Sequence, residues 1–238
     1  MAVDIFSDNR SYYHRVNPGY EKDDEIKILE EVEIFRNGYI VFRNDLVSIP
    51  GVKEPSPFLR LKTPASDGTV VVAVWPQCDL IAVVKQFRYP AAVWEVALPR
   101  GFSNPGDENS IMTGFREFSE EVGGQLHSDR RWSLGRILTD SGKLHDAPHI
   151  ILAELAFPRS VDFPSNPDAT EAIAEQEYRS WVPFHMLQSW VESGKIVDSF
   201  TCAAVARLRP HFNECGKFAP REDILAMNHL KNSDSLFI

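Results

Sequence analysis

The sequence contains little that would cross-link, secrete or anchor the chain. Its 238 residues include three cysteines, Cys78, Cys202 and Cys215, too few and too scattered for a disulfide framework or a zinc cluster. No run approaches the roughly 20 apolar residues of a membrane-spanning helix. The N-terminus also lacks the basic start and apolar run of a secretory signal. We therefore expect a cytoplasmic protein with no membrane partner.

Positive charge is also scarce. The chain has 25 Lys and Arg against 34 Asp and Glu, which gives a formal net charge of −9. A general nucleic-acid binder needs a basic face that neutralises phosphates, so nucleic acid is not an expected partner. An acidic protein can still act on a small anion where metal ions and a few arginines reverse the local field.

The first 65 residues predict an extension followed by a small antiparallel β region. Residues 1–25 are polar, which indicates a loosely attached segment. Two apolar runs, 32–35 and 39–42, flank Asn37-Gly38, and this arrangement is a strong hairpin signal. A further strand is expected at 58–61, after a proline-rich break.

Residues 66–210 predict one mixed domain, and 211–238 a C-terminal tail. Apolar, β-branched runs predict strands at 69–75, 80–84, 132–138, 149–157 and 178–182. The first of these runs is continuous enough to be buried on both faces. Helical patterns cover 110–122, 184–193 and 200–208. Strands with a few interspersed helices predict a mixed α/β or α+β sandwich around one core.

The helix predicted at 110–122 has an apolar side and an acidic side. Its apolar stripe, which a sheet can bury, consists of Ile111, Phe115, Phe118 and Val122. Gly123 stands where a left-handed residue would end the helix.

Three glutamates, Glu117, Glu120 and Glu121, occupy positions i, i+3 and i+4 of this helix. Their carboxylates therefore converge on one face and repel one another. Hard divalent cations, which prefer oxygen ligands, would offset that repulsion. A solvated, salt-bridged face is the alternative, and it is the usual fate of a charge run.

The longer spacing around these glutamates resembles the Nudix box, Gly-x5-Glu-x7-Arg-Glu-U-x-Glu-Glu-x-Gly-U, where U is a bulky apolar residue. From Glu108 the chain reads Glu-x7-Arg-Glu-Phe-x-Glu-Glu-x-Gly, with every fixed residue in place. Six residues instead of five separate Gly101 from Glu108, so the loop carries an insertion or Asp107 and Glu108 share a role. Gly124 stands where the final apolar residue belongs.

Segments outside the box resemble the ADP-ribose and nucleoside-diphosphate-sugar pyrophosphatase branch of this family. They are residues 85–90, 93–95, 98–101 and 190–198. The resemblance implies a Nudix-type α/β/α sandwich with a mixed sheet over 66–210. It also implies that the small antiparallel β region of residues 1–65 helps to form a homodimer.

The resemblance further implies a metal site for Mg²⁺, which Mn²⁺ can replace. Glu117 and Glu121 would be the principal ligands, and Glu120 a further ligand with a catalytic part. The main-chain oxygen of Arg100 would complete the coordination shell. Gly101 and Glu108 would support the box.

A fourth carboxylate is expected from the acidic stretch 171–178. Glu177 matches the family position best, and Glu175 is close behind. Either would serve as a metal ligand or a general base. The alternative for both is a solvated loop.

Three residues are candidates for binding the substrate. Arg88 offers planar paired donors to phosphate oxygens, although an edge-strand surface arginine is an alternative. Trp94 can stack on a base, although a core tryptophan is the commoner fate. Arg116 lies within the box beside the glutamates. His145 and His149 are interpreted as structural.

The function that the resemblance implies is hydrolysis of the diphosphate bond of a nucleoside diphosphate linked to a sugar. The products would be a nucleoside monophosphate and a sugar phosphate. ADP-ribose hydrolases of this branch often have a proline about fifteen residues after the box. Residues 137–142 lack it, which weakens the case for ADP-ribose specifically and leaves other dinucleotide or nucleotide-sugar substrates open.

Two further alternatives remain. One is a house-cleaning hydrolase of modified nucleoside triphosphates, which the long N-terminal β region disfavours. The other is a catalytically silent ligand sensor, against which the intact Glu117, Glu120 and Glu121 argue.

Overall fold

The computed structural model describes residues 25–63, 68–104, 106–157 and 176–221. The chain divides into two compact units, of which the first comprises 1–64 with 140–146, and the second 65–139 with 147–238. The predicted extension, except Glu25, and most of the predicted tail lie outside the described residues.

The first unit is built on a four-stranded antiparallel sheet. Its strands are β1 (Lys27–Glu30), β2 (Glu33–Arg36), β3 (Val41–Ser48) and β4 (Ser56–Lys62). Strand β3 pairs with β4 along one side and with β1 and β2 along the other. At the β2–β3 turn, the Asn37 side chain accepts hydrogen bonds of 2.8 Å from the N–H groups of Tyr39 and Ile40. The predicted hairpin is confirmed.

Residues 140–146 extend this sheet, although the sequence analysis placed them in the second domain. The N–H of Leu61 in β4 donates to the Lys143 carbonyl at 2.9 Å, and the N–H of His145 donates to the Leu61 carbonyl at 2.8 Å. Asp146 accepts from the N–H of Thr63 at 2.7 Å. These bonds satisfy backbone groups on the outer edge of β4, which a strand edge otherwise leaves open.

The second unit contains a seven-stranded mixed sheet. Its strands are β5 (Thr69–Trp75), β6 (Leu80–Arg88), β7 (Val93–Ala97), β8 (Arg100–Gly101), β9 (Gln125–Arg136), β10 (His149–Phe157) and β11 (Gln176–Pro183). The main order is β11-β6-β5-β10-β9, with β7 paired to β6 and β8 to β5. Strand β10 runs parallel to β5, and the other pairs are antiparallel.

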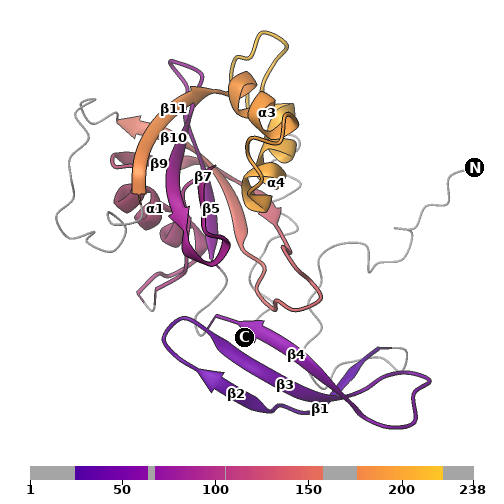
Figure 1. Cartoon of the computed structure of the whole chain (residues 1–238). Helices are drawn as coiled ribbons and strands as arrows, with labels where there is room; N and C mark the ends of the chain where they lie inside the picture. Colours follow the sequence, from indigo (N-terminus) through magenta and orange to yellow (C-terminus); the bar gives the residue numbers. More distant parts are fainter. Residues whose placement is uncertain (1–24, 64–67, 105, 158–175, 222–238) are drawn as a thin grey trace, which may run out of the picture. The chain divides into compact units, whose positions relative to one another are not determined.

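Helices cover both faces of the larger sheet (Figure 1). Helix α1 (Ser110–Glu121) lies on one face, and α3 (Phe184–Glu192) and α4 (Ser199–Leu208) lie on the other. Alternate residues of β5 are buried in two separate apolar clusters, one beneath α1 and one beneath α3 and α4. The predicted burial of β5 on both faces is confirmed, and so is the predicted α/β/α sandwich with a mixed sheet.

The last described residues fold back onto the core. A short 3-10 helix (Arg209–His211) follows α4, and the ring of Phe212 stacks on Phe184 with centroids 4.4 Å apart. The N–H of Phe218 donates to the Asp79 carboxylate at 2.8 Å. Within the described part of the chain, no helix is long and apolar enough to cross a membrane.

Candidate active site

Both ends of helix α1 are fixed by local sequence. The side chain of Asn109 accepts hydrogen bonds from two N–H groups of the first turn. At the other end, the N–H of Gly123 donates to the Phe118 carbonyl at 3.0 Å, and Gly123 has φ +87°. The predicted left-handed end is confirmed. Gly124 has φ +98°, a region that side chains rarely adopt, which accounts for glycine where the box has an apolar residue.

Glu121 is buried against strands β6 and β8. One carboxylate oxygen accepts a hydrogen bond from Gln86 Nε2 at 2.7 Å, and the other accepts from the backbone N–H of Arg100 at 3.1 Å. Its exposed fraction is 7%. Burial raises the pKa of Glu121, and the hydrogen bonds from Gln86 and Arg100 only partly oppose that rise.

Glu117 lies one turn earlier and contacts the backbone of β8 at Gly101. A Cβ atom at position 101 would lie 1.9 Å from the carboxylate carbon of Glu117, so glycine at this position is needed for Glu117 to keep its place. Burial raises the pKa of Glu117 to about 7, and the negative charges of Glu121 and Glu120 add to the rise that Arg116 opposes. Two carboxylates therefore share a buried site that disfavours their charge.

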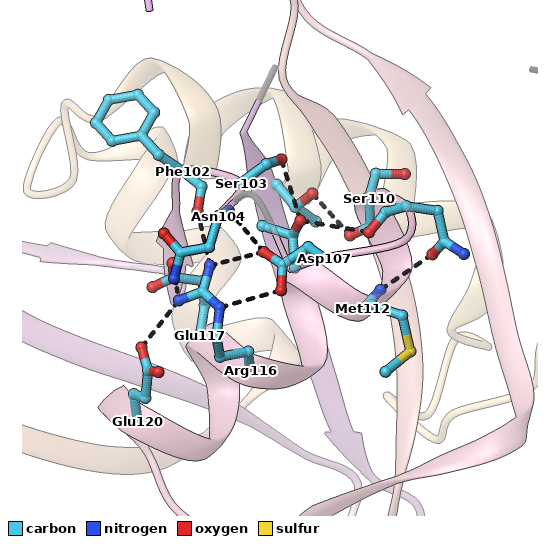
Figure 2. A network of polar contacts seen from close by, with 12 residues as sticks. Phe102, Ser103, Asn104, Asp107, Ser110, Met112, Arg116, Glu117 and Glu120 are labelled. Carbon is cyan, nitrogen blue, oxygen red and sulfur yellow. Dashed lines mark hydrogen bonds and ion pairs between the residues drawn. The ribbon is translucent and has the colours of Figure 1, made fainter. Parts of the chain in front are cut away.

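Glu120 is oriented differently from the other two glutamates. Its carboxylate accepts a hydrogen bond from Arg116 Nη1 at 3.0 Å, and 41% of its side chain is exposed (Figure 2). Arg116 Nη1 also contacts Glu117 at 2.8 Å. Arg116 thus pairs with both Glu117 and Glu120, and the charges of Glu120 and Glu121 both raise the pKa of Glu117.

Asp107, and not Glu108, contacts the box arginine. Arg116 donates to the two Asp107 oxygens at 3.3 and 3.0 Å and to the Phe102 carbonyl at 2.7 Å (Figure 2). The hydrogen bond from Arg116 lowers the pKa of Asp107. Glu108 is exposed and makes no side-chain bond to any residue that the structure describes. The contact with Arg116 is thus made by Asp107, which five residues separate from Gly101, as in the box spacing.

Arg88 belongs to a chain of ion pairs beside Glu121. Its Nε donates to Glu95 of β7 at 2.8 Å, and the same Glu95 oxygen accepts from Arg100 Nη2 at 3.1 Å. Arg100 Nη1 pairs with Asp198 at the start of α4. The Nη2 atom of Arg88 is buried and has no hydrogen-bond partner among the described residues. The side chain of Arg100 therefore binds Glu95 and Asp198, and its backbone N–H donates to Glu121.

Trp94 is half exposed and does not lie in the core. Its ring lies 5.5 Å from that of Phe87 and 5.5 Å from the Lys85 ammonium. Neighbouring residues of a strand point to opposite faces. Since Glu95 contacts Arg88, Trp94 is directed away from the Arg88 side.

The predicted fourth carboxylate falls largely outside the described residues. Glu175 lies outside them, and Glu177 lies in β11 where the pairing with β6 is irregular, its side chain outside the described part. In the described residues, no group of three or more His, Cys, Asp or Glu side chains is arranged to hold a metal ion. Glu117 and Glu121 would supply two of the six positions of an octahedral Mg²⁺ shell, which proteins commonly leave for water and substrate phosphates to complete.

The histidines have the positions of packing groups. His149 is buried between the hydroxyls of Ser110, at 2.8 Å, and Ser133, at 2.6 Å, and so ties the start of α1 to the sheet. His145 belongs to the first unit, where its N–H bonds to Leu61.

Sequence reasoning missed three polar residues at the site. Gln86 and Glu95 reach it through strand register, because Gln86 of β6 pairs with Glu95 of β7. Asp198 precedes a helical pattern and caps the Thr201 N–H at 2.9 Å, a signal that the sequence carries. No pattern in the nearby sequence predicts its pairing with Arg100, which is 98 positions away.

Comparison with known proteins places the fold but not the family. Scans against known protein families and against curated proteins give no match. A search of solved structures matches a protein described as an ADP compounds hydrolase, with a TM-score of 0.58 and 15% identity, over 80% of this chain and 95% of that one. At that identity the likeness concerns the fold alone. The chain has the Nudix-type α/β/α sandwich that the sequence analysis predicted.

Proposed function

We propose that the chain is a metal-dependent hydrolase of the diphosphate bond in a nucleoside diphosphate linked to a sugar or similar group. The observation that carries this proposal is the carboxylate pair of Glu117 and Glu121, largely removed from solvent, beside Arg88, whose Nη2 atom is buried without a partner among the residues that the structure describes. The solved structure of an ADP compounds hydrolase with the same fold supports an ADP-containing substrate.

The residues present fit a divalent cation. Burial raises the pKa of both Glu117 and Glu121, so a nearby positive charge would favour their ionised forms. Mg²⁺, or Mn²⁺ in its place, prefers such oxygen ligands and leaves part of its shell to water and substrate phosphates. When bound, it would polarise the phosphate oxygens and lower the pKa of a bound water.

The remaining roles follow from the contacts of each side chain. Glu117 and Glu121 would be ligands, and the Arg100 main-chain oxygen a further one. Arg88 would bind a phosphate oxygen through its open Nη2 edge. Glu120, Glu177 and Glu175 remain the candidates for the general base. Arg116 holds the helix to the preceding loop through Asp107 and Phe102, so its part is to support the box.

A substrate panel tests the proposal directly. ADP-ribose, nucleotide sugars, dinucleotides and nucleoside triphosphates are incubated with the protein in magnesium and in EDTA, and released phosphomonoester is measured. We expect turnover of a sugar-linked nucleoside diphosphate in magnesium only. Preference for triphosphates would support the house-cleaning alternative, and no turnover of any substrate would support the ligand sensor.

We also propose that the first unit forms a homodimer contact. Large apolar side chains are exposed on its sheet, among them Leu29, Ile34, Phe35 and Leu59. Exposed large apolar side chains on a small sheet are typical of an interaction surface. Sedimentation velocity should give the mass of two chains, and Phe35→Glu should shift it toward one. A wild-type protein that sediments as a single chain contradicts this proposal.

A further inference from the structure

Glu95 holds two arginines with one carboxylate oxygen. Its Oε1 accepts from Arg88 Nε at 2.8 Å and from Arg100 Nη2 at 3.1 Å, and 13% of its side chain is exposed. These arginines come from β6 and β8, while Glu95 lies on β7, so the carboxylate connects three strands. Hydrogen bonds between ionised partners are the strong ones, and a shared acceptor fixes both donors relative to each other.

The Arg100 end of this arrangement is anchored. Arg100 Nη1 pairs with Asp198, and the guanidinium lies 4.4 Å from the centre of the Phe200 ring. Asp198 in turn accepts from the N–H and the hydroxyl of Thr201, at 2.9 and 2.6 Å. Because Asp198 also caps α4, the position of Arg100 follows that of the helix.

At the Arg88 end, one hydrogen-bond donor has no partner among the described residues. Glu95 occupies the Nε edge of its guanidinium, and the Nη2 atom is buried with no partner in the described part of the chain. Two residues earlier, on the same face of β6, Gln86 binds Glu121 and its own Oε1 is also buried without such a partner. Two polar atoms of β6 beside the carboxylate pair therefore lack a hydrogen-bond partner among the residues that the structure describes. A phosphate oxygen would accept the hydrogen bond that Arg88 Nη2 can donate.

We propose that Glu95 is a positioning residue that orients Arg88 for a phosphate group of the substrate. This inference rests on the proposed function. Glu95 accepts from Nε and so fixes the plane of the guanidinium, which leaves the neighbouring Nη2 atom to bind the anion. Arg100 and Asp198 fix Glu95 from the other side. Glu95 itself contacts arginines and acts on the substrate only through Arg88.

A double-mutant cycle tests this role by binding, without turnover. The dissociation constant of α,β-methylene-ADP, a diphosphate that resists hydrolysis, is measured by calorimetry in magnesium for the wild type, Glu95→Gln, Arg88→Gln and the double variant. Each single variant should bind at least about tenfold more weakly, because a charge-assisted contact is lost. The double variant should lie within about twofold of Arg88→Gln, since the two residues act as one unit.

Two measurements separate positioning from a general structural effect. Glu95→Gln should keep Mn²⁺ affinity within about twofold of the wild type, and in turnover assays its loss should fall on KM. Glu154→Gln is the matched control, because Glu154 is also buried and pairs with Arg130 at 2.6 Å, but on β10. It should bind the diphosphate normally. If Glu95→Gln does not fold, Glu95→Asp, which shortens the side chain, replaces it in the cycle.

Three results would overturn the inference. The first is that Glu95→Gln binds α,β-methylene-ADP as tightly as the wild type does. The second is that Glu95→Gln lowers this affinity by the same factor when Arg88 has already been replaced by glutamine. The third is that the wild type does not bind α,β-methylene-ADP. Failure of the proposed function is distinguishable, because a protein that binds the diphosphate but hydrolyses no substrate keeps the cycle intact.

Discussion

The two sides of helix α1 place acidic groups in different electrostatic surroundings. On one side, Asp107 and Glu120 both contact Arg116, whose charge lowers the pKa of Asp107. On the other side, burial raises the pKa of Glu121, and it raises that of Glu117 although Arg116 lies 2.8 Å away. The comparison separates Asp107, whose ionised form the hydrogen bond from Arg116 stabilises, from Glu117 and Glu121, in which burial outweighs the nearby positive groups, so an added cation would favour their ionised forms.

The largest expected effect is loss of turnover from the buried pair. Glu121→Gln should reduce kcat/KM about 1,000-fold or more, because even a partner outside the ligand shell is worth about 10- to 100-fold. Glu120→Gln, the control on the Arg116 side, should lose less if its role is the ion pair alone. If kcat/KM fell equally in the two variants, the two sides of α1 would not differ in their part in catalysis.

The second effect concerns stability and pH in the metal-free protein. The pKa of Glu117 is about 7 in the fold against an ordinary value of 4.5, so the folded state binds the proton more tightly. Its contribution to the free energy of unfolding is present in full below pH 4.5 and is lost as the pH rises through 7. The loss is on the order of 3 kcal/mol.

Urea unfolding at pH 5 and pH 8 in EDTA measures this loss. Glu117→Gln should reduce the difference between the two pH values, and magnesium should restore the wild type at pH 8 because it binds the ionised pair. A wild type with the same pH dependence as Glu117→Gln would mean that Glu117 titrates normally.

The third effect is smaller and tests the fit beside Glu117. Gly101→Ala places a methyl group where the carboxylate lies, and the flexible end of Glu117 must move away. Mn²⁺ affinity should fall about tenfold, the scale of a disturbed supporting contact, while the melting temperature changes little. Gly106→Ala, where an added Cβ meets nothing within 4 Å, is the control and should bind Mn²⁺ normally.

The smallest effect distinguishes Asp107 from Glu108. Asp107→Asn should lower the free energy of unfolding by about 1 kcal/mol, because it weakens a charged hydrogen bond to Arg116. Glu108→Gln should leave it unchanged, since the side chain is exposed. Chemical denaturation at pH 7 measures both variants. A larger loss in Glu108→Gln would restore that residue to the role predicted from the spacing.

Local patterns predicted much of the fold. The Asn37-Gly38 hairpin, the buried strand 69–75 and the end of α1 at Gly123 all follow from turn chemistry or periodicity over a few residues. The pairing of residues 140–146 with β4 could not be predicted, because it joins segments about 80 positions apart through backbone groups and the Asp146 carboxylate, and no local pattern indicates their partners.

The sequence indicated which acidic residues of α1 belong to the site, but it did not indicate which side chains contact one another. Successive residues of a helix are about 100° apart, so Glu121 lies about 40° from Glu117, and Glu120 about 40° from Arg116. The Arg116–Glu120 pair follows this spacing, whereas the Arg116–Glu117 contact joins successive residues and could not be predicted from it. The Glu95 contacts depend on the register of β6 with β7, and no local pattern fixes that register.

A Mn²⁺ titration followed by electron paramagnetic resonance at pH 7.5 is the most direct test of the central claim, that Glu117 and Glu121 form a cation site. The wild type should bind Mn²⁺, and Glu121→Gln should weaken that binding at least about tenfold while Glu154→Gln leaves it intact. Equal Mn²⁺ affinity in the wild type and Glu121→Gln would contradict the account.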